Sequence, residues 1–315
     1  MMNAAFDIEI SGRGWLTLIN TRDRNSLGAN ARQPHAERAR LTRGAIVLRM
    51  ESITRRRSLR LLALGAGAAT LGIPLLRHRL HAAKPPLQTM RHKPKAVVLD
   101  VIETCFAVDP LDEKLSELGL PAGSLKIWFP RVLRDAFALQ VTGTYKGFAE
   151  IATGALASLL AENKIEPNAE KMEGVIKSFA TLPVHPDVKE GIQLLRDAGI
   201  RVAALTNGSA ATTRKMFAGA DLEDAIEKFI SIEEVKQWKP AAAVYLHAAK
   251  QLDLAPADLA LVAAHDWDID GAAKAGLTTA YIARKQPRGS SAMSPPDVTA
   301  HTLPEAARAL LALPG

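Results

Sequence analysis

The chain has little cysteine and few aromatic residues. Cys105 is the only cysteine among 315 residues, and Phe, Trp and Tyr together make up 5% of the sequence. A single cysteine excludes an intramolecular disulfide, so the fold must be held together by its core. The hydrophobic share of 48% and the length are sufficient for one or two domains with a sizeable core. No pattern of a cysteine hydrolase surrounds Cys105, and we expect a small buried thiol beside the first strand.

Excess positive charge is missing from most of the chain, although the formal net charge is +7. Residues 1–95 hold 18 of the 40 basic residues and 5 of the 33 acidic ones, which leaves 22 basic and 28 acidic residues in the remainder. The remainder is therefore mildly acidic. Because nucleic-acid binding needs clustered cations on the folded part, we expect no nucleic-acid partner.

Long uninterrupted apolar runs are also absent. The apolar run 61–76 is interrupted by glycines and Pro74, and it is too short for a confident membrane span. Basic residues precede this run and small residues follow it, which is typical of a secretory signal. The paired Arg56 and Arg57 resemble a twin-arginine export signal. We therefore expect export through that machinery, to a bacterial periplasm, or a membrane anchor if the signal is not cleaved.

Residues 1–49 precede this signal and are rich in arginine. One interpretation is a mistaken extension, with Met50 as the true start of the protein. The other is a disordered basic tail. Residues 50–94 would then be the signal and a linker.

From residue 95 the chain alternates apolar strands with amphipathic helices, a pattern that predicts an α/β fold with a parallel sheet. The segment between the first two strands carries apolar residues at helical spacing. We therefore predict a Rossmann-like core, residues 95–110 and 184–315, with a helical cap, residues 111–183, inserted after the first strand. The predicted strands are residues 96–100, 201–205, 259–264 and 278–282. The predicted helices are residues 124–141, 145–163, 168–181, 187–197, 210–219, 241–252 and 269–275.

Polar residues stand at or near the ends of the predicted strands, in four ordered elements. Because the carboxyl ends of parallel strands meet at one edge of a sheet, where ligands bind, these elements predict a common site. Each element alone has an ordinary structural explanation, such as a helix N-cap, and only their order favours a site. The elements are Asp100 with Thr104, Thr206 with Asn207, Lys239 with Tyr245, and residues 261–271.

This order of residues, over about residues 95–290, resembles the haloacid dehalogenase superfamily of hydrolases. The resemblance implies a Rossmann-like core and an aspartate nucleophile, here Asp100, that forms a covalent ester. Such an ester divides one difficult displacement into two easier steps. The resemblance also implies that Thr206 and Lys239 hold the substrate anion, and a cation beside Asp100 keeps it ionised.

Two departures distinguish branches of this superfamily. Its phosphatases carry a second acid two residues after the nucleophile, where this chain has Ile102. They also carry a metal-binding acid in the fourth element, where alignment on Asp268 places Ala264. Neither replacement can transfer a proton or bind magnesium, which prefers carboxylate oxygens. The branch that works without metal, the 2-haloacid dehalogenases, fits better, and we expect no metal and no cofactor.

Three positions also differ from the familiar dehalogenase pattern. Phe129 follows the cap tryptophan where those enzymes have arginine, and Arg131 or Arg134 is a candidate substitute. Ala263 replaces a serine of the fourth element. His265 replaces an asparagine and is interpreted as a general base, a donor to halide, or a packed histidine.

The sequence thus predicts a hydrolase that removes halogen from short 2-haloalkanoic acids with inversion. Its partner would be a small anionic substrate, and a homodimer is left open. Asp268 would orient Lys239 or activate water. The alternatives are a divergent phosphatase of the same superfamily and an inactive core kept as a binding module. The predicted catalytic residues are Asp100, Lys239, Asp268 and His265, and the predicted substrate-binding residues are Thr104, Thr206, Asn207, Tyr245, Phe129 and Arg131.

Overall fold

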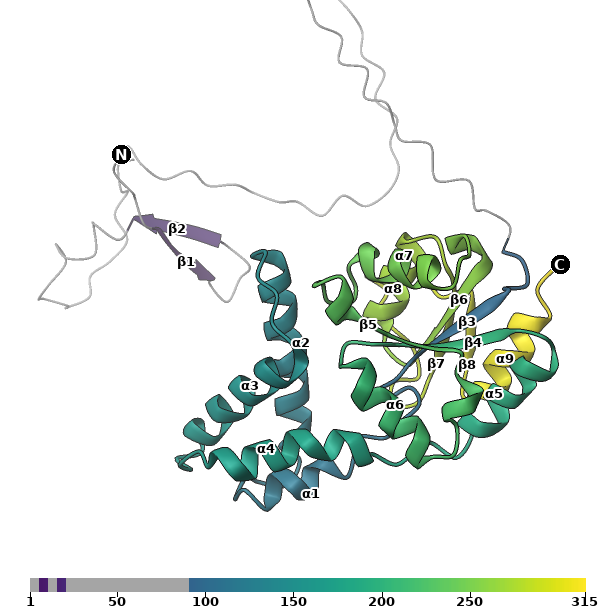
Figure 1. The fold of residues 1–315 in the computed structure, drawn as a ribbon. Coiled ribbons are helices and arrows are strands. Elements are labelled where there is room, and N and C mark those ends of the chain that lie inside the picture. The colour runs from purple at the N-terminus through teal and green to yellow at the C-terminus, as the bar shows by residue number, and fades with distance from the viewer. Residues whose placement is uncertain (1–5, 11–15, 21–90) are drawn as a thin grey trace, which may run out of the picture. The chain divides into compact units, whose positions relative to one another are not determined.

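The computed structural model describes residues 6–10, 16–20 and 91–315 (Figure 1). The expected signal and nearly all of its linker lie outside these residues. Within residues 1–49 the structure describes an antiparallel pair, β1 (Phe6–Ile10) with β2 (Leu16–Asn20), which the sequence analysis did not predict. None of the helices in the described part of the chain has the length and apolar character needed to cross a membrane.

A six-stranded sheet, ordered β5-β4-β3-β6-β7-β8, forms the centre of the body, and its neighbouring strands are all parallel. Every residue of β3, β6 and β7 is buried, as expected for strands that are covered on both faces. The strands are β3 (Ala96–Asp100), β4 (Arg201–Thr206), β5 (Lys228–Ser231), β6 (Leu259–Ala263), β7 (Thr278–Ile282) and β8 (Val298–Ala300).

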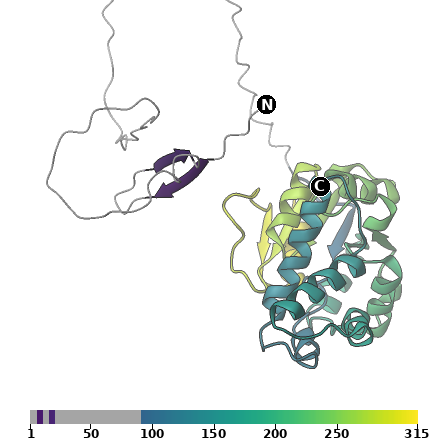
Figure 2. The same cartoon turned by 90° about the vertical axis from the view of Figure 1, so that its left-hand side faces the viewer.

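Helices cover both faces of this sheet. Figure 1 shows α7 and α8 on one face and α5, α6 and α9 on the other, and Figure 2 shows the body from the side on which the helices between β3 and α5 lie, with those helices in front. For α5 to α8 this division follows from right-handed crossovers, because the chain moves outward from β3 in one direction and then returns to build the other half. These helices are α5 (Val188–Asp197), α6 (Ala210–Gly219), α7 (Ala242–Gln251), α8 (Asp266–Lys274) and α9 (Leu303–Leu311).

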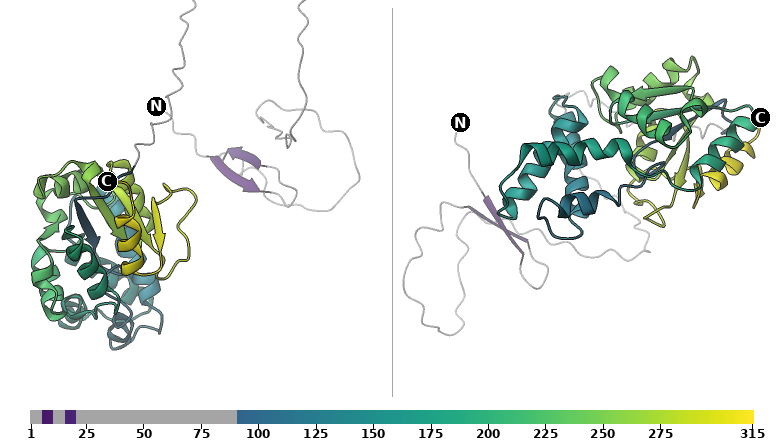
Figure 3. Two further views of the ribbon diagram at one scale, coloured as in Figure 1. Left: turned by 90° about the vertical axis from the view of Figure 1, so that its right-hand side faces the viewer. Right: turned by 60° about the horizontal axis from the view of Figure 1, so that its bottom comes forward.

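A helical insert between β3 and α5 forms the predicted cap (Figure 3, right). Trp128 is buried inside it and donates its indole N–H to the carbonyl of Ala152, at 3.0 Å, which joins two cap helices. Trp238 of the core donates its indole N–H to the carbonyl of Lys146 and so fixes the cap to the core. The insert contains α1 (Leu111–Ser116), α2 (Leu125–Val141), α3 (Phe148–Glu162), α4 (Ala169–Lys177) and the 3-10 turn η2 (Ser178–Thr181).

The structure therefore confirms the predicted fold class, a Rossmann-like parallel sheet with a helical cap after its first strand. β3 lies at the point where the connections change direction, with β4 on one side and β6 on the other. At such a switch point the loops at the carboxyl ends separate and leave a crevice. Asp100, the last residue of β3, stands at that crevice.

Candidate active site

The loops that follow three neighbouring strands bring the predicted residues together. Asp100 ends β3, Thr206 ends β4, and His265 follows β6 by two residues. Lys239 comes from the loop before α7, and Asp268 lies in the first turn of α8. Residues that are more than one hundred positions apart in the chain thus share one edge of the sheet.

A buried lysine links two carboxylates at the base of the site. Nζ of Lys239 donates to Oδ1 of Asp100 at 3.0 Å and to Oδ2 of Asp268 at 2.8 Å. Lys239 and Asp268 have no exposed surface. Taking such charges out of water is expensive, so the cluster is stable only because each charge has a partner.

The electrostatics keep Asp100 ionised. Burial alone would raise the pKa of this carboxyl group, but the charges of Lys239 and His265 and the hydrogen bonds to Asp100 lower it well below its ordinary range. Burial would lower the pKa of Lys239, but Asp100 and Asp268 raise it above its ordinary value. The site therefore holds a carboxylate beside an ammonium, as the sequence predicted.

Both carboxylate oxygens of Asp268 accept hydrogen bonds from neighbouring side chains. Its Oδ2 accepts from Lys239, and its Oδ1 accepts from the hydroxyl of Tyr245 at 2.5 Å. Gly271, one helical turn further on, allows this close packing. A Cβ at Gly271 would lie 2.6 Å from the carbonyl oxygen of Pro240 and 2.7 Å from the hydroxyl of Tyr245. Asp268 thus fixes the position of Lys239.

Thr104 ties the loop after β3 to the end of β6. Its hydroxyl donates to Oδ2 of Asp100 at 2.6 Å and accepts the backbone N–H of Ala264 at 2.9 Å. Asn207 serves the other side of the site, because its side-chain oxygen accepts the backbone N–H of Lys239 at 3.1 Å. Both residues therefore position the charged groups.

The loop after β4 prepares the N-terminus of α6. The hydroxyl of Thr206 accepts the backbone N–H of Gly208 at 2.9 Å. Ser209 is the N-cap of α6, and its hydroxyl accepts the backbone N–H of Thr212 at 3.1 Å. The first turn of a helix provides backbone amides that suit an anion.

His265 lies between two carboxylates and against an aromatic ring. Its Nε2 lies 2.9 Å from Oε2 of Glu103, and its Nδ1 lies 3.4 Å from Oδ2 of Asp100. The imidazole stacks on Trp267, with ring centroids 5.0 Å apart. Burial would lower the pKa of His265, but the contacts with Asp100 and Glu103 raise it to about 10. His265 is therefore an imidazolium while Asp100 is a free carboxylate.

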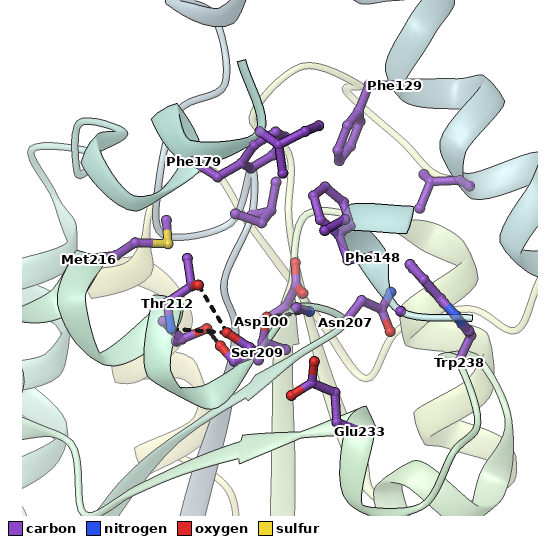
Figure 4. Close-up of a pocket in the computed structure, with 18 of the residues that line it drawn as sticks. Asp100, Phe129, Phe148, Phe179, Asn207, Ser209, Thr212, Met216, Glu233 and Trp238 are labelled. Carbon is purple, nitrogen blue, oxygen red and sulfur yellow. Dashed lines mark hydrogen bonds between the residues drawn. The ribbon is translucent and has the colours of Figure 1, made fainter. Parts of the chain in front are cut away.

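A cavity of about 360 Å³ opens over these groups, between the cap and the core (Figure 4). Figure 4 shows Phe129, Phe148 and Phe179 of the cap above Asp100 and Asn207. One side of the cavity is thus apolar, and the other carries the polar groups of the sheet edge. Further lining residues include Ile102, Leu133, Thr206, Ser209, Thr212, Met216, Glu233, Trp238, His265 and Trp267.

The structure does not bring every predicted residue to this cavity. Thr104, Lys239, Tyr245 and Asp268 are buried behind Asp100 and do not line it. Arg131 lies away from it and pairs with Glu162 of the cap, with N and O 2.7 Å apart.

Glu103 lies inside the first element, but no role was predicted for it from the sequence. Its φ of +64° places it in the left-handed region, which turns the chain sharply after β3. That turn sends its carboxylate towards His265, 162 residues away. The aromatic cap residues Phe148 and Phe179 were also missed, because their spacing is that of an ordinary amphipathic helix.

The residues present do not fit the magnesium site of phosphatases. Ala264 stands where their metal-binding acid would be needed, and its side chain has no oxygen; Ile102, in place of their second acid, cannot transfer a proton. Among residues 91–315, no group of three or more His, Cys, Asp or Glu side chains is arranged to hold a metal ion.

Comparison with known proteins agrees with this geometry. A parallel sheet with an aspartate at its switch point and an inserted helical cap defines a class of α/β hydrolases. Residues 94–276 match the haloacid dehalogenase-like hydrolases, and the chain therefore belongs to this family of enzymes.

Curated relatives include (S)-2-haloacid dehalogenase 1 from Pseudomonas sp. (strain CBS-3), which is 28% identical over 192 residues, 60% of this chain and 85% of the relative. Haloacetate dehalogenase H-2 from Moraxella sp. (strain B) is 24% identical over 196 residues, 61% of this chain and 87% of the relative. Among solved structures, the L-2-haloacid dehalogenase from Xanthobacter autotrophicus with chloropropionic acid covalently bound is similar in fold. Its TM-score is 0.64 at 23% identity, and the match covers 70% of this chain and 99% of that one.

Proposed function

We propose that this enzyme hydrolyses short 2-haloalkanoic acids to 2-hydroxyalkanoic acids through an ester on Asp100, without a metal ion. The observation that carries the proposal is the ionised Asp100, held by Lys239 at the polar side of an otherwise apolar cavity. The similarity to 2-haloacid dehalogenases supports the substrate class. A saturated carbon that carries a halide needs only an aligned carboxylate to be attacked.

In the first step an oxygen of Asp100 attacks the carbon that carries the halogen. The carbon–halogen bond breaks, halide leaves on the opposite side, and the configuration at that carbon inverts. The substrate carboxylate would lie near Thr206, Asn207 and Ser209, where the N-terminus of α6 offers backbone amides. The apolar cap residues exclude water from the attack.

In the second step water attacks the carbonyl carbon of the ester. The bond between that carbon and the substrate oxygen breaks, so the product carries an oxygen atom that came from Asp100. Nζ of Lys239 lies 3.0 Å from Oδ1 of Asp100, the oxygen that is not bonded to the substrate, and it stabilises the negative charge that develops on that oxygen.

Isotope labelling tests the ester. With excess enzyme in ¹⁸O-water, one turnover of 2-chloropropionate should give unlabelled product, and intact mass should show the label in the protein. Labelled product from an unlabelled enzyme would refute an Asp100 ester. The same reaction without added metal, measured as chloride release, tests the independence from magnesium.

Two further assays examine the alternatives. Magnesium-dependent hydrolysis of p-nitrophenyl phosphate, without halide release from haloacids, would identify a phosphatase. A binding module would show no turnover, and Asp100→Ala would leave its ligand binding unchanged. Ile102 and Ala264 argue against the phosphatase, since neither side chain can transfer a proton or bind magnesium.

We also propose that the enzyme is exported through a twin-arginine signal around Arg56 and Arg57. The basic stretch before the apolar run 61–76 supports this proposal. N-terminal sequencing of the protein from its native source tests it. A mature start after residue 80 is expected, and a start before residue 50 would contradict both the signal and Met50 as the first residue.

A further inference from the structure

One polar atom beside the nucleophile has no hydrogen-bond partner. Nδ1 of His265 is among the few buried side-chain nitrogen or oxygen atoms in residues 91–315 without one. It lies 3.4 Å from Oδ2 of Asp100, and His265 lines the cavity. Its ion-pair contact is thus with the carboxylate that reacts, at a distance that is long for a hydrogen bond.

The imidazole is held in place on two sides. Nε2 lies 2.9 Å from Oε2 of Glu103, and the ring stacks on Trp267 at an interplanar angle of 25°. A carboxylate on one ring nitrogen fixes the tautomer, since that nitrogen carries the proton. In the neutral ring the free electron pair is then on Nδ1, the atom that faces Asp100.

The other carboxylate near the ester does not reach the cavity. Both oxygens of Asp268 accept hydrogen bonds from buried donors, Lys239 and Tyr245. The side chain of Asp268 has no exposed surface. A water molecule in the cavity therefore meets His265 and not Asp268.

We propose that Glu103 and His265 form the pair that hydrolyses the Asp100 ester, with Nδ1 of His265 as the base that removes a proton from water. This inference rests on the proposed function and assigns its second step. His265 is the catalytic residue of the pair. Glu103 is a positioning residue that acts through the imidazole.

The proton balance of the step closes. Water adds its oxygen to the carbonyl carbon, and one of its protons goes to Nδ1. When the tetrahedral intermediate collapses, the alkoxide of the 2-hydroxyalkanoate takes that proton and leaves. Asp100 is released as a carboxylic acid and gives its proton to Nδ1, which restores the initial pair of imidazolium and carboxylate.

The charge of Asp100 determines when His265 can act as a base. While Asp100 is a carboxylate, His265 is an imidazolium and holds no free electron pair. Once Asp100 is esterified, that negative charge is gone, and within residues 91–315 the carboxylate that still pairs with the ring is that of Glu103. His265 then loses one proton to solvent, which is the proton that the net reaction releases.

Burst kinetics with 2-chloropropionate test the proposal. In His265→Gln, chloride should be released in a burst of one equivalent per active site, at a rate within a few fold of the native enzyme. Steady turnover should then fall by roughly 10²- to 10⁴-fold, the usual contribution of a general base. Intact mass should show the ester accumulating on the protein.

The variant Glu103→Gln tests whether Glu103 acts through His265 or only maintains the local fold. Its ring contact is kept but the negative charge is lost, so ester hydrolysis should continue with its pH profile moved to lower pH. A purely structural role would change the rate and leave the pH profile in place. The chain offers a matched control in Glu234 and His247, which form the same type of pair at 3.0 Å outside the cavity. Glu234→Gln and His247→Asn should change neither the burst nor the pH profile.

Two results would overturn the assignment. A His265→Gln enzyme that turns over at the native rate would exclude a base at this position. A variant with a slowed burst and no accumulated ester would make His265 a substrate-binding cation instead. If the native enzyme itself releases no chloride, the proposed function fails first, and the two failures are therefore distinguishable.

Discussion

Lys239 and Asp268, 29 residues apart in the chain, form an ion pair in which neither side chain has any exposed surface. A pair of this kind is worth little as a source of stability, because desolvation offsets most of its attraction. Its importance lies in position: Asp268 fixes the ammonium that keeps Asp100 ionised.

Lys239→Ala should abolish most of the activity, because Asp100 loses the cation that keeps it ionised. We expect a loss of roughly 10²- to 10³-fold, the range found when one electrostatic donor is removed. The free energy of unfolding should also fall by about 3–5 kcal/mol, since Asp268 is left buried without a cation and Asp100 loses one of its two cationic neighbours. Chloride release, urea unfolding and circular dichroism measure these effects, with secondary structure retained.

Lys274→Ala is the control for this change. The exposed Lys274 pairs with Asp270 of α8 outside the charged centre, and a pair with one exposed partner contributes little. Native activity in Lys239→Ala would contradict the role of the ammonium.

Stability should fall as the pH rises from about 6.5 to about 10 because of His265. Its pKa in the folded state is about 10, above the ordinary value of 6.5. In this interval the folded state binds more protons than the unfolded state, so the free energy of unfolding decreases with pH. The carboxylates of Asp100 and Glu103 face the imidazole ring, and Lys239 and Lys285 in turn face those carboxylates. The stabilisation by His265 is complete below pH 6.5.

Urea unfolding at a series of pH values measures this effect. His265→Asn should flatten the decrease, whereas His247→Asn should leave it unchanged. An identical slope in the native protein and in His265→Asn would show that the ring is neutral in the folded enzyme.

Gly271→Ala should damage the site although the change adds a single methyl group. The added Cβ would meet the carbonyl oxygen and Cβ of Pro240 at 2.6 Å, and backbone atoms cannot yield as a flexible side chain can. The loop that carries Lys239 must then shift, and activity should fall at least tenfold, because small displacements of positioned groups are costly. Gly154→Ala in α3 is the control, since nothing lies within 4 Å of a Cβ there, and alanine favours a helix. Equal activity of both variants would show that the packing around Gly271 is tolerant.

Phe148→Ala should change which acids are accepted. The ring of Phe148 packs edge to face against Phe179, with centroids 4.8 Å apart, in the apolar wall of the cavity. Its removal leaves room for longer substrate chains, and one methylene group is worth about 1–3 kcal/mol in such a pocket. The ratio of kcat/KM for 2-bromohexanoate to that for 2-chloropropionate should therefore rise roughly tenfold or more. Phe148→Leu should give a smaller rise, and an unchanged ratio would place the substrate chain elsewhere.

The buried strands and the helices of the body were predictable from the sequence, since both rest on apolar patterns. The predicted strand 96–100 is β3, and residues 278–282 are β7. β5 and β8 were missed, because both are short and only partly buried, so no continuous apolar run identifies them. α9 was missed as well, although Thr302 caps it and its apolar residues recur at helical spacing.

The charged centre was also predictable, because Asp100, Lys239 and Asp268 follow an ordered set of motifs. The pairing of Glu103 with His265 was not, since it depends on a turn of positive φ and on a contact across 162 residues. The position of Arg131 was equally hidden, because its distance from the cavity depends on how the cap helices pack. Sequence patterns therefore predicted which residues meet at the sheet edge, and tertiary packing decided which neighbours contact them.

The insertion of the whole cap into one connection, between β3 and α5, has an evolutionary consequence. Phe129, Phe148 and Phe179 of the cavity wall come from that insert, whereas Asp100 and its charged neighbours come from the sheet edge. Mutations in the insert can therefore be selected for a new substrate without disturbing the residues that make and break bonds. The cap sequence can therefore change during evolution while the charged centre at the sheet edge is kept.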